Sequence, residues 1–350
     1  MNERTAAALR ADCESAATDV RVLEPLRGQR LLVTGGTGFM GSWIAEMATW
    51  LNDAHGFGID LLLLAPSASA FGERAPHLAS RADVTLIEED VRNITGLPSG
   101  VTYVIHAAGT PDNRVHVTDP LRTMSTIANG TSAMLRAAAD SQTLRKMLNV
   151  SSGLVYGAQP LDMAGMPETH AGGPSPDSIS SIYAEAKRYA EAEAAAWRSQ
   201  SKLPVVTARP FAFIGPYQGL DKPWAVNNFL RDALLGGPIR ILGDADTVRS
   251  YMYPSDMANW LLAILVAGVP GTAYNVGSPD EITLGALAER IAASFPTPPA
   301  VECRPLGEPR INRFVPDVSR ATSTLGLTVS VGLDRAIQRT VEWHRAGVGR

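Results

Sequence analysis

Two side chains that can move a proton together, Tyr183 and Lys187, stand four residues apart in an alanine-rich stretch that predicts a helix over 183–198. This spacing puts the phenol and the ammonium on one face of the helix, one turn apart. A neighbouring cation stabilises the phenolate and lowers the phenol pKa, so we expect Tyr183 to act as a general acid–base near neutral pH. The same pair can also arise by chance, so it needs support from the rest of the chain.

Two serines, Ser151 and Ser152, close the predicted strand over 146–152. We expect their hydroxyls to emerge at the carboxyl edge of the sheet and to face the same cleft as Tyr183. A serine at a strand end often caps a turn instead. Beside a phenol–ammonium pair, we interpret Ser152 as a group that orients a substrate alcohol.

Three glycines, Gly35, Gly38 and Gly41, mark the turn between a short apolar strand at 31–33 and a helical pattern that begins at Phe39. A dinucleotide site needs glycine here for a tight turn, for close backbone approach to a pyrophosphate and for close packing of helix on strand. A glycine-rich loop alone is weak evidence, but this one has the strand before it and the helix after it. The stretch therefore predicts a dinucleotide site.

Strands and helices continue to alternate after this turn. Further strands are predicted at 59–65, 84–91, 101–109, 146–152 and 205–210, and further helices at 120–139 and 183–198. This order indicates an α/β fold with a Rossmann-like, doubly wound parallel sheet. Ligands of such sheets bind at the carboxyl ends of the strands.

The chain divides into three predicted parts. Residues 1–27 form an N-terminal extension, expected to be a surface helix or a partly disordered arm, and residues 28–210 form the dinucleotide-binding domain with the catalytic residues. Residues 211–350 form a smaller mixed α/β lobe, mainly for substrate. Helices are predicted in it near 226–235, 255–266 and 284–295, and short strands near 239–242 and 249–253.

Composition narrows the class of protein. The chain has 350 residues, a net charge of −4 and no basic block, so neither nucleic acid nor an anionic membrane is expected as its main partner. Its two cysteines, Cys13 and Cys303, are too few for a disulfide framework and are not spaced as metal ligands. With no apolar signal core and no long apolar run, we expect a cytoplasmic protein without a metal site.

Five motifs occur in an order that resembles the extended short-chain dehydrogenase/reductases. They are the glycine triplet, Ile105-His-Ala-Ala-Gly109, Asn129-Gly-Thr131, Ser151-Ser-Gly-Leu-Val-Tyr-Gly157 and Tyr183-x-x-x-Lys187. Within that group the chain is similar to the nucleotide-sugar epimerase/dehydratase family, from about residue 28 to about residue 325. The ordered set is specific for the family and much less so for the substrate.

The resemblance implies NAD as cofactor and a nucleotide-diphosphate sugar as substrate, with Ser152, Tyr183 and Lys187 as catalytic residues. The implied cofactor residues are Gly35, Thr37, Gly38, Phe39, Met40, Gly41, Asp90, Val91, Ala107, Ala108, Gly109, Asn129, Ser151, Tyr183, Lys187 and Pro210. The implied substrate residues are Ser152, Asn227, Asn228, Arg249 and Arg310, with Arg249 on the diphosphate. Two of these have a plain alternative, because Asn227 can cap its helix and Arg310 can be a solvated surface charge.

Two positions depart from the family's pattern. Ala65-Pro66-Ser67 stands where NAD-preferring members carry an acid at the end of the second strand, and Ala212 replaces a common asparagine. No basic residue stands there for a 2′-phosphate either, Arg74 being several residues further on. We therefore expect NAD and leave NADP open.

The two residues after Ser152, Gly153 and Leu154, narrow the implied reaction. At this strand end the family's 4,6-dehydratases carry an Asp–Glu pair, its decarboxylases use a Glu, and a 3,5-epimerase would need a cysteine. The remaining set of Ser152, Tyr183 and Lys187 suffices for hydride transfer at an alcohol carbon. We expect a 4-epimerase. A 4-ketoreductase that consumes external NAD(P)H would use the same residues, and a catalytically silent binding protein on this fold is the third alternative.

The helices predicted at 120–139 and 183–198 are the pair that family members pack into a four-helix dimer interface. Their many alanines permit close approach, so the resemblance predicts a homodimer. The alternative is that these small faces pack only on their own sheet.

Overall fold

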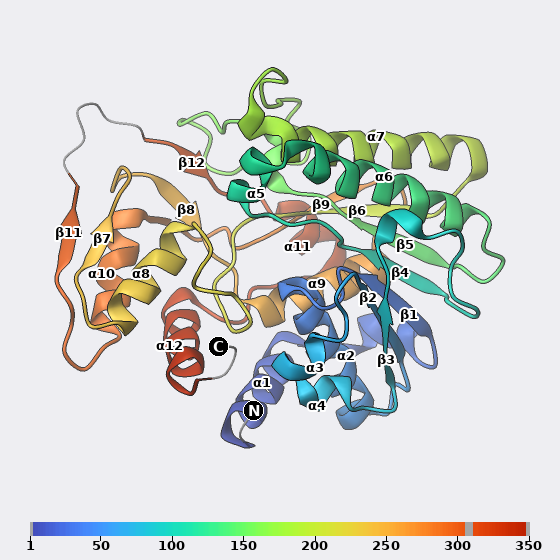
Figure 1. Cartoon of the computed structure of the whole chain (residues 1–350), viewed down its shortest axis with the longest axis horizontal. Coiled ribbons are helices and arrows are strands. Elements are labelled where there is room, and N and C mark those ends of the chain that lie inside the picture. Colours follow the sequence, from blue (N-terminus) through green and yellow to red (C-terminus); the bar gives the residue numbers. More distant parts are fainter. Residues whose placement is uncertain (1–2, 305–310, 348–350) are drawn as a thin grey trace.

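Seven parallel strands form the central sheet of the computed structural model, which describes residues 3–304 and 311–347 (Figure 1). Their order across the sheet is β3-β2-β1-β4-β5-β6-β9. The strands are β1 (Arg30–Thr34), β2 (Asp60–Ala65), β3 (Val84–Glu88), β4 (Tyr103–His106), β5 (Lys146–Val150), β6 (Val205–Pro210) and β9 (Ala273–Val276). The predicted Rossmann-like fold and its six strands are confirmed, and β9 adds a seventh strand that was not predicted.

Helices cover both faces of this sheet, as the buried strands require. On one face α6 (Pro120–Ala139) and α7 (Ile182–Ser201) pack side by side, over an apolar cluster that includes Leu32, Leu62 and Val104. On the other face α2 (Phe39–His55) and α9 (Pro254–Ala267) pack over Leu31, Val33 and their neighbours. Successive residues of β1 thus point into opposite layers, so its three central residues, Leu31, Leu32 and Val33, are all apolar.

A second, smaller lobe lies beyond the carboxyl ends of β5 and β6, on the left in Figure 1. It contains a three-stranded sheet in the order β10-β8-β12 and the strand pair β11-β7. Its elements are α8 (Ala225–Leu234), β7 (Ile239–Ile241), β8 (Val248–Ser250), β10 (Glu281–Thr283), α10 (Leu284–Ala293), β11 (Val301–Cys303) and β12 (Arg313–Phe314). The chain then ends with α11 (Ser319–Leu325) and α12 (Leu333–Arg345).

The domain boundary predicted at residue 210 does not separate the central sheet from the smaller lobe. Strand β9 extends the central sheet beside β6, and α9 lies almost entirely buried beneath it. The chain therefore leaves the central sheet after β6, builds part of the small lobe and returns. The helix predicted near 255–266 is present as α9, but it is buried against the central sheet instead of belonging to the smaller lobe, in keeping with the apolar run around Trp260.

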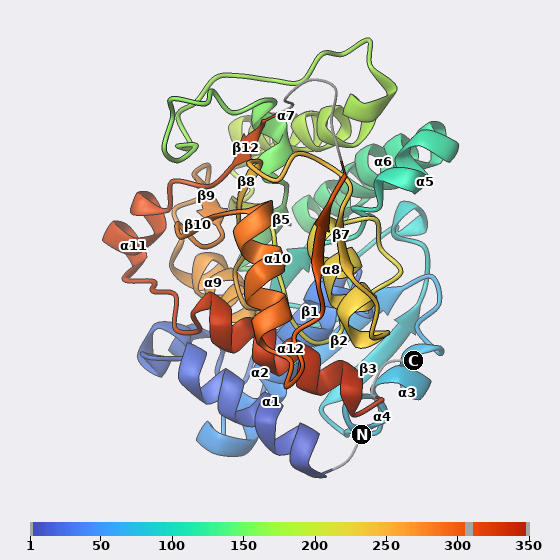
Figure 2. The ribbon, with the colours of Figure 1, turned by 90° about the vertical axis from the view of Figure 1, so that its left-hand side faces the viewer.

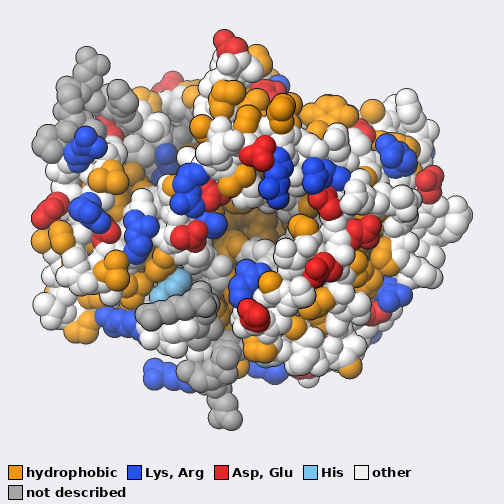
Figure 3. Space-filling view, viewed as in Figure 1, with side chains coloured by type: hydrophobic (Ala, Val, Ile, Leu, Met, Phe, Trp, Pro, Cys, Tyr) orange, Lys and Arg blue, Asp and Glu red, His pale blue; other side chains and the backbone are white. Residues whose placement is uncertain are grey.

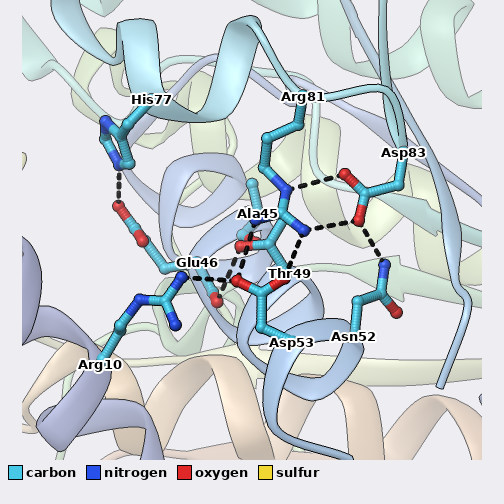
Figure 4. A network of polar contacts seen from close by, with 9 residues as sticks. All are labelled: Arg10, Ala45, Glu46, Thr49, Asn52, Asp53, His77, Arg81 and Asp83. Carbon is cyan, nitrogen blue, oxygen red and sulfur yellow. Dashed lines mark hydrogen bonds and ion pairs between the residues drawn. The ribbon is translucent and has the colours of Figure 1, made fainter. Parts of the chain in front are cut away.

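The N-terminal segment is ordered and joins the core. It forms α1 (Glu3–Ala16) and the 3-10 helix Val20–Leu26, and α1 buries Leu9 and Cys13 against α2 and α9. Figure 4 shows how charge holds α1 in place: Arg10 and Arg81 both bind the carboxylate of Asp53 on α2. Of the two forms predicted for residues 1–27, the helix is present, with a buried face.

The last helix meets the first. Asp12 on α1, itself buried, accepts a hydrogen bond of 2.5 Å from Tyr253 and forms an ion pair with Arg339 on α12 (Figures 1 and 2). Burial raises the pKa of the Asp12 carboxyl to about 6. No helix in the described part of the chain is both long and apolar enough to span a bilayer.

Candidate functional site

The glycine turn after β1 is packed backbone against backbone. Gly35 has φ +68°, and a Cβ on it would lie 2.8 Å from the carbonyl oxygen of Ala107. A Cβ on Gly41 would lie 2.2 Å from the carbonyl oxygen of Gly36. Gly38 is the N-cap of α2 and offers no side chain there, so the first amides of the helix stay open to an anion. This cradle fits a pyrophosphate.

The other predicted residues of this turn surround the cradle. Thr37 is buried, and its carbonyl oxygen accepts a 2.5 Å hydrogen bond from Arg74. Phe39 and Met40 begin α2 and are partly buried against the large core, with the Phe39 ring 5.9 Å from that of Phe213.

The three predicted catalytic residues meet at the carboxyl end of β5. Ser152 follows the strand, and its hydroxyl accepts a 3.2 Å hydrogen bond from the amide of Leu154. The same hydroxyl lies beside the phenol of Tyr183 at the start of α7 and lowers the pKa of that phenol. Lys187, one turn further along, donates a 2.7 Å hydrogen bond to the carbonyl of Val150 and lies 5.9 Å from the centroid of the Tyr183 ring. All three side chains are buried. Figure 3 shows a hollow near the middle of this side of the molecule, with an apolar floor and charged groups around its rim.

The pKa of Tyr183 differs from the prediction. Burial raises it to about 12, although the hydrogen bond from Ser152 lowers it. Burial also lowers the pKa of Lys187 to about 8, against the opposing influence of Glu191. The lowered phenol pKa that spacing alone predicted is therefore wrong for the protein without cofactor, because desolvation exceeds the effect of an ammonium that is turned toward a carbonyl.

Two residues near Tyr183 were missed in the sequence. His116 on α5 (Asn113–Thr118) stacks on the Tyr183 ring, with centroids 4.6 Å apart and planes 10° apart, and its Nε2 lies 2.7 Å from the carbonyl oxygen of Thr110. Ile127 on α6 packs against Tyr183 from another side. Neither had a sequence signal, since an isolated histidine and a helical isoleucine are both ordinary core residues.

A buried polar chain runs behind the catalytic residues and was also missed. Ser151 donates a 2.5 Å hydrogen bond to Glu191 on α7, which forms a two-pronged ion pair with Arg209 on β6. Arg209 also donates to the hydroxyl of Tyr156, which in turn donates to Asn275 on β9. The only available signal was the position of Glu191, four residues after Lys187 on the same helical face.

The residues predicted to bind the adenosine half of the cofactor come together only in part. Asp90 is bound by Arg92 at 2.6 Å, and Val91 is buried so closely against α6 that a Cβ on Gly130 would lie 2.7 Å from it. Asn129 is exposed and donates to Ser125 one turn back on the same helix. The remaining predicted residues lie at the strand ends: Ala107, Ala108 and Gly109 after β4, and Pro210 at the end of β6.

The predicted substrate residues differ in how far their polar groups are already hydrogen-bonded within the protein. Asn227 is buried and donates to the carbonyl of Gly219, while its Oδ1 has no partner among the residues that the structure describes. Asn228 is already bound by Arg231. Arg249 on β8 has carbonyl oxygens as its partners, those of Val248 and Asn312. Arg310 lies outside the described residues.

Comparison with known proteins identifies the family. The model of the NAD dependent epimerase/dehydratase family matches residues 31–277. The chain belongs to this family. UDP-glucuronic acid decarboxylase 1 of Arabidopsis thaliana is 29% identical to it over 317 residues, 90% of this chain and 70% of the relative.

Solved structures share the family's fold with this chain. A dTDP-glucose 4,6-dehydratase of Streptomyces venezuelae, with NAD and TYD bound, has a TM-score of 0.79 at 23% identity and covers 92% of this chain and 98% of its own. The UDP-glucuronic acid 4-epimerase of Bacillus cereus has a TM-score of 0.76 at 20% identity and covers 91% and 99%. The predicted family and NAD as its cofactor are confirmed, and the relatives act on several nucleotide sugars by different reactions.

The residues present fit that cofactor. The glycine cradle accepts a pyrophosphate, and from the same sheet edge Lys187 lies within 3.9 Å of the place that a Cβ on Gly109 would take. Lys187 and Gly109 are thus close together at the end of the sheet where the second half of a dinucleotide would lie. No group of three or more His, Cys, Asp or Glu side chains suited to a metal occurs within residues 3–304 and 311–347.

Proposed function

We propose that this family member is a nucleotide-sugar epimerase that inverts C4 through a transient 4-keto sugar. The observation that carries the proposal is the buried contact of Ser152, Tyr183 and Lys187, together with the absence of any acid at the two positions that follow Ser152. This set supplies one proton acceptor and one orienting hydroxyl, which hydride transfer at an alcohol carbon requires, and provides no group for elimination or decarboxylation there.

The packing around Gly153 supports this choice. A Cβ at this position would lie 2.7 Å from the ring of Phe211, which itself stacks on Phe314 with ring centroids 4.4 Å apart. The adjacent Leu154 is exposed. An acidic side chain at 153 would therefore have to displace an aromatic pair, so the absence of an acid is built into the surrounding packing.

The residues divide the chemistry as follows. Tyr183 as phenolate removes the proton from the C4 hydroxyl, and Ser152 holds the reacting oxygen by a hydrogen bond. Held by the glycine cradle and Lys187, NAD would supply a reversible hydride acceptor at C4, which would allow inversion of a sugar that turns within the site. Tyr183 then gives its proton back to the C4 oxygen. Because burial raises the Tyr183 pKa to about 12, the phenolate needs the positive charge of Lys187 together with that of the nicotinamide ring, which bound NAD would add. The buried surroundings keep water away from the keto sugar.

Arg249 supports a diphosphate-containing substrate. Burial lowers the pKa of its guanidinium, and its hydrogen-bond partners among the described residues are carbonyl oxygens rather than carboxylates. A partly desolvated cation without an anionic partner is well suited to bind a diphosphate by two hydrogen bonds. With Asn227 as a neutral partner, this side of the site would select a nucleotide-diphosphate sugar.

A 4-ketoreductase is the second candidate, because the same three residues can deliver a proton while external NAD(P)H supplies the hydride. It is favoured by Ala65, which leaves the end of β2 without the acid that holds the adenosine ribose in many dinucleotide sites. A weakly held cofactor suits an enzyme that must exchange it after each turnover.

We also propose a cytoplasmic homodimer built on α6 and α7. Leu121 and Tyr189 on these helices are 78% and 50% exposed, and a dimer interface on α6 and α7 would cover both. Light scattering at micromolar concentration should give twice the chain mass, and a Leu121→Glu variant should shift the protein toward monomer. A wild-type monomer would contradict this proposal.

Two measurements test the reaction. The protein as purified is denatured and its released nicotinamide cofactor is quantified. It is then incubated, without added cofactor, with UDP-glucose and with UDP-glucuronic acid. Near-stoichiometric NAD(H) and the appearance of a C4 epimer support the epimerase. An empty protein that needs NADPH and a 4-keto sugar supports the reductase, and release of CO2 from UDP-glucuronic acid would contradict both.

A further inference from the structure

The end of β2 lacks the side chain that normally recognises the adenosine ribose. In dinucleotide-binding folds an acid near this point accepts hydrogen bonds from the ribose hydroxyls of NAD, and its charge opposes the 2′-phosphate of NADP. Here the strand ends in Ala65 and continues with Pro66 and Ser67. The neighbouring strand shows what can take this place.

Glu88 is the in-register neighbour of Ala65. The last pairing of the parallel strands β2 and β3 joins Ala65 to Glu88, and the amide of Glu89 donates to the carbonyl of Ala65. Paired residues on adjacent strands project to the same side of a sheet. The Glu88 carboxylate therefore starts one strand spacing, about 4.8 Å, from the position where the missing acid would begin.

The carboxylate of Glu88 contacts the loop that follows β2. Its Oε2 accepts a 2.9 Å hydrogen bond from the amide of Ser69, and hydrogen bonds from Ser69 lower the pKa of the Glu88 carboxyl. Its other oxygen has no partner among the described residues. The glycine turn borders the same strand end, because the amide of Gly36 donates to the carbonyl of Leu64. Glu88 is thus charged, restrained on one side and one strand removed from the strand end that borders the cradle.

A cation stands on the other side of this region. Arg74 at the end of α3 (Phe71–Arg74) donates to the carbonyl of Thr37 in the glycine turn, and no carboxylate among the described residues binds it. A guanidinium beside the cradle that is bound to a carbonyl oxygen but to no carboxylate among the described residues attracts a 2′-phosphate. Recognition of the ribose therefore depends on the balance between Glu88 and Arg74.

We propose that Glu88, supplied by β3, takes the place of the missing acid on β2, accepts the adenosine ribose hydroxyls and makes this protein prefer NAD to NADP. The proposal concerns cofactor choice and does not depend on which reaction the site performs. It places the specificity-determining charge one strand away from its usual position.

Calorimetric titration of the cofactor-depleted protein with NAD and with NADP tests this without any sugar substrate. The wild type should bind NAD at least about tenfold more tightly than NADP, since a hydrogen bond to a charged group contributes about that much. Glu88→Gln should reduce this ratio about tenfold or more, with part of the change a gain in NADP affinity. The matched control is Glu89→Gln, which removes the same charge from the residue after β3, and it should keep the wild-type ratio.

Two further variants locate the charge. Ala65→Asp combined with Glu88→Gln should restore the preference for NAD, because the acid returns to β2. Glu73→Gln on α3 should leave the ratio unchanged. An unchanged ratio in Glu88→Gln, a loss of preference in Glu73→Gln, or a wild type that prefers NADP would each overturn the proposal. Thermal melting of every variant shows that the compared proteins are folded.

Discussion

The loop after β1 and the loop after β5 lie at the same edge of the sheet. Backbone contacts fix the geometry of the first loop, and side-chain contacts fix that of the second. In the glycine turn, backbone meets backbone, and a single added Cβ at Gly41 would lie 2.2 Å from a carbonyl oxygen. After β5, side chains meet side chains: Ser152 with Tyr183, and Ser151 with Glu191. The cofactor half should therefore be damaged by added atoms, and the catalytic half by lost polar atoms.

The largest effect should come from removing one oxygen at the catalytic end. Tyr183→Phe should lower kcat by roughly 10²–10⁴, because the substrate hydroxyl loses its proton acceptor. The affinity for NAD, measured by calorimetry, should change by less than about threefold, since burial and stacking of the ring are kept. Tyr189→Phe on the exposed side of α7 is the control and should keep full activity. If Tyr183→Phe also lost NAD binding, the two loops would not be separable.

The second-largest effect should come from adding one methyl group to the glycine turn, at the cofactor end of the site. Gly41→Ala brings the new Cβ within 2.5 Å of three backbone atoms of Gly36, so the turn must move. We expect NAD affinity to fall about 100-fold, equivalent to about 2.7 kcal/mol, and the melting temperature to drop. Gly96→Ala, where a Cβ would meet no atom within 4 Å, should have neither effect. Wild-type NAD affinity in Gly41→Ala would show that the cradle is not packed as described.

His106 on β4 connects β1 with α6. Substituting it should have a smaller effect than either of the two changes above. Its ring hydrogen-bonds Thr34 at the end of β1 and Thr131 on α6, and burial lowers its pKa from 6.5 to about 3. The unfolded chain therefore binds a proton that the folded chain does not, so stability falls as the pH drops from 6.5 toward 3. Between pH 7 and pH 5 this amounts to about 2 kcal/mol.

Urea denaturation at the two pH values measures this contribution. His106→Asn should be less stable at pH 7 and should lose about 2 kcal/mol less than the wild type on going to pH 5. Comparing the two proteins cancels groups of opposite sign, such as Asp12 with its raised pKa. The exposed His55→Asn variant should show the wild-type pH dependence. Equal slopes in His106→Asn and the wild type would mean that His106 is protonated while folded.

The smallest expected effect concerns the stack on Tyr183. His116→Ala removes a ring whose plane lies within 10° of the phenol plane, and it should cost about 1 kcal/mol of unfolding free energy. His116→Phe keeps an aromatic face and should recover most of that loss in the same denaturation experiment. A phenylalanine variant no better than alanine would show that the hydrogen bond to Thr110, rather than the stack, is what His116 contributes.

The glycine turn and the catalytic side chains were predictable for different reasons. The turn can be predicted from one short stretch of sequence, because a strand, three spaced glycines and a helix follow one another there. The pairing of Tyr183 with Lys187 can be predicted from the helical repeat alone. What surrounds them is long-range. His116, Ile127 and Phe211 reach the site from separate elements, and no local pattern connects them with Tyr183 or Gly153. The pKa of Tyr183 was mispredicted for the same reason, because spacing gives the distance to a charge but not the extent of desolvation.

The contact between Asp12 and Arg339 has a consequence for the newly made chain. The first helix leaves the ribosome about 330 residues before its partner on the last helix. At bacterial and eukaryotic translation speeds this interval is roughly 15–65 s. Leu9 and Cys13 lack α9 until residues 254–267 have been made, and α1 lacks its ion-pair partner on α12 for the whole interval. The apolar face of the first helix is therefore available to chaperones during synthesis, and burial of this helix must be among the last steps of folding.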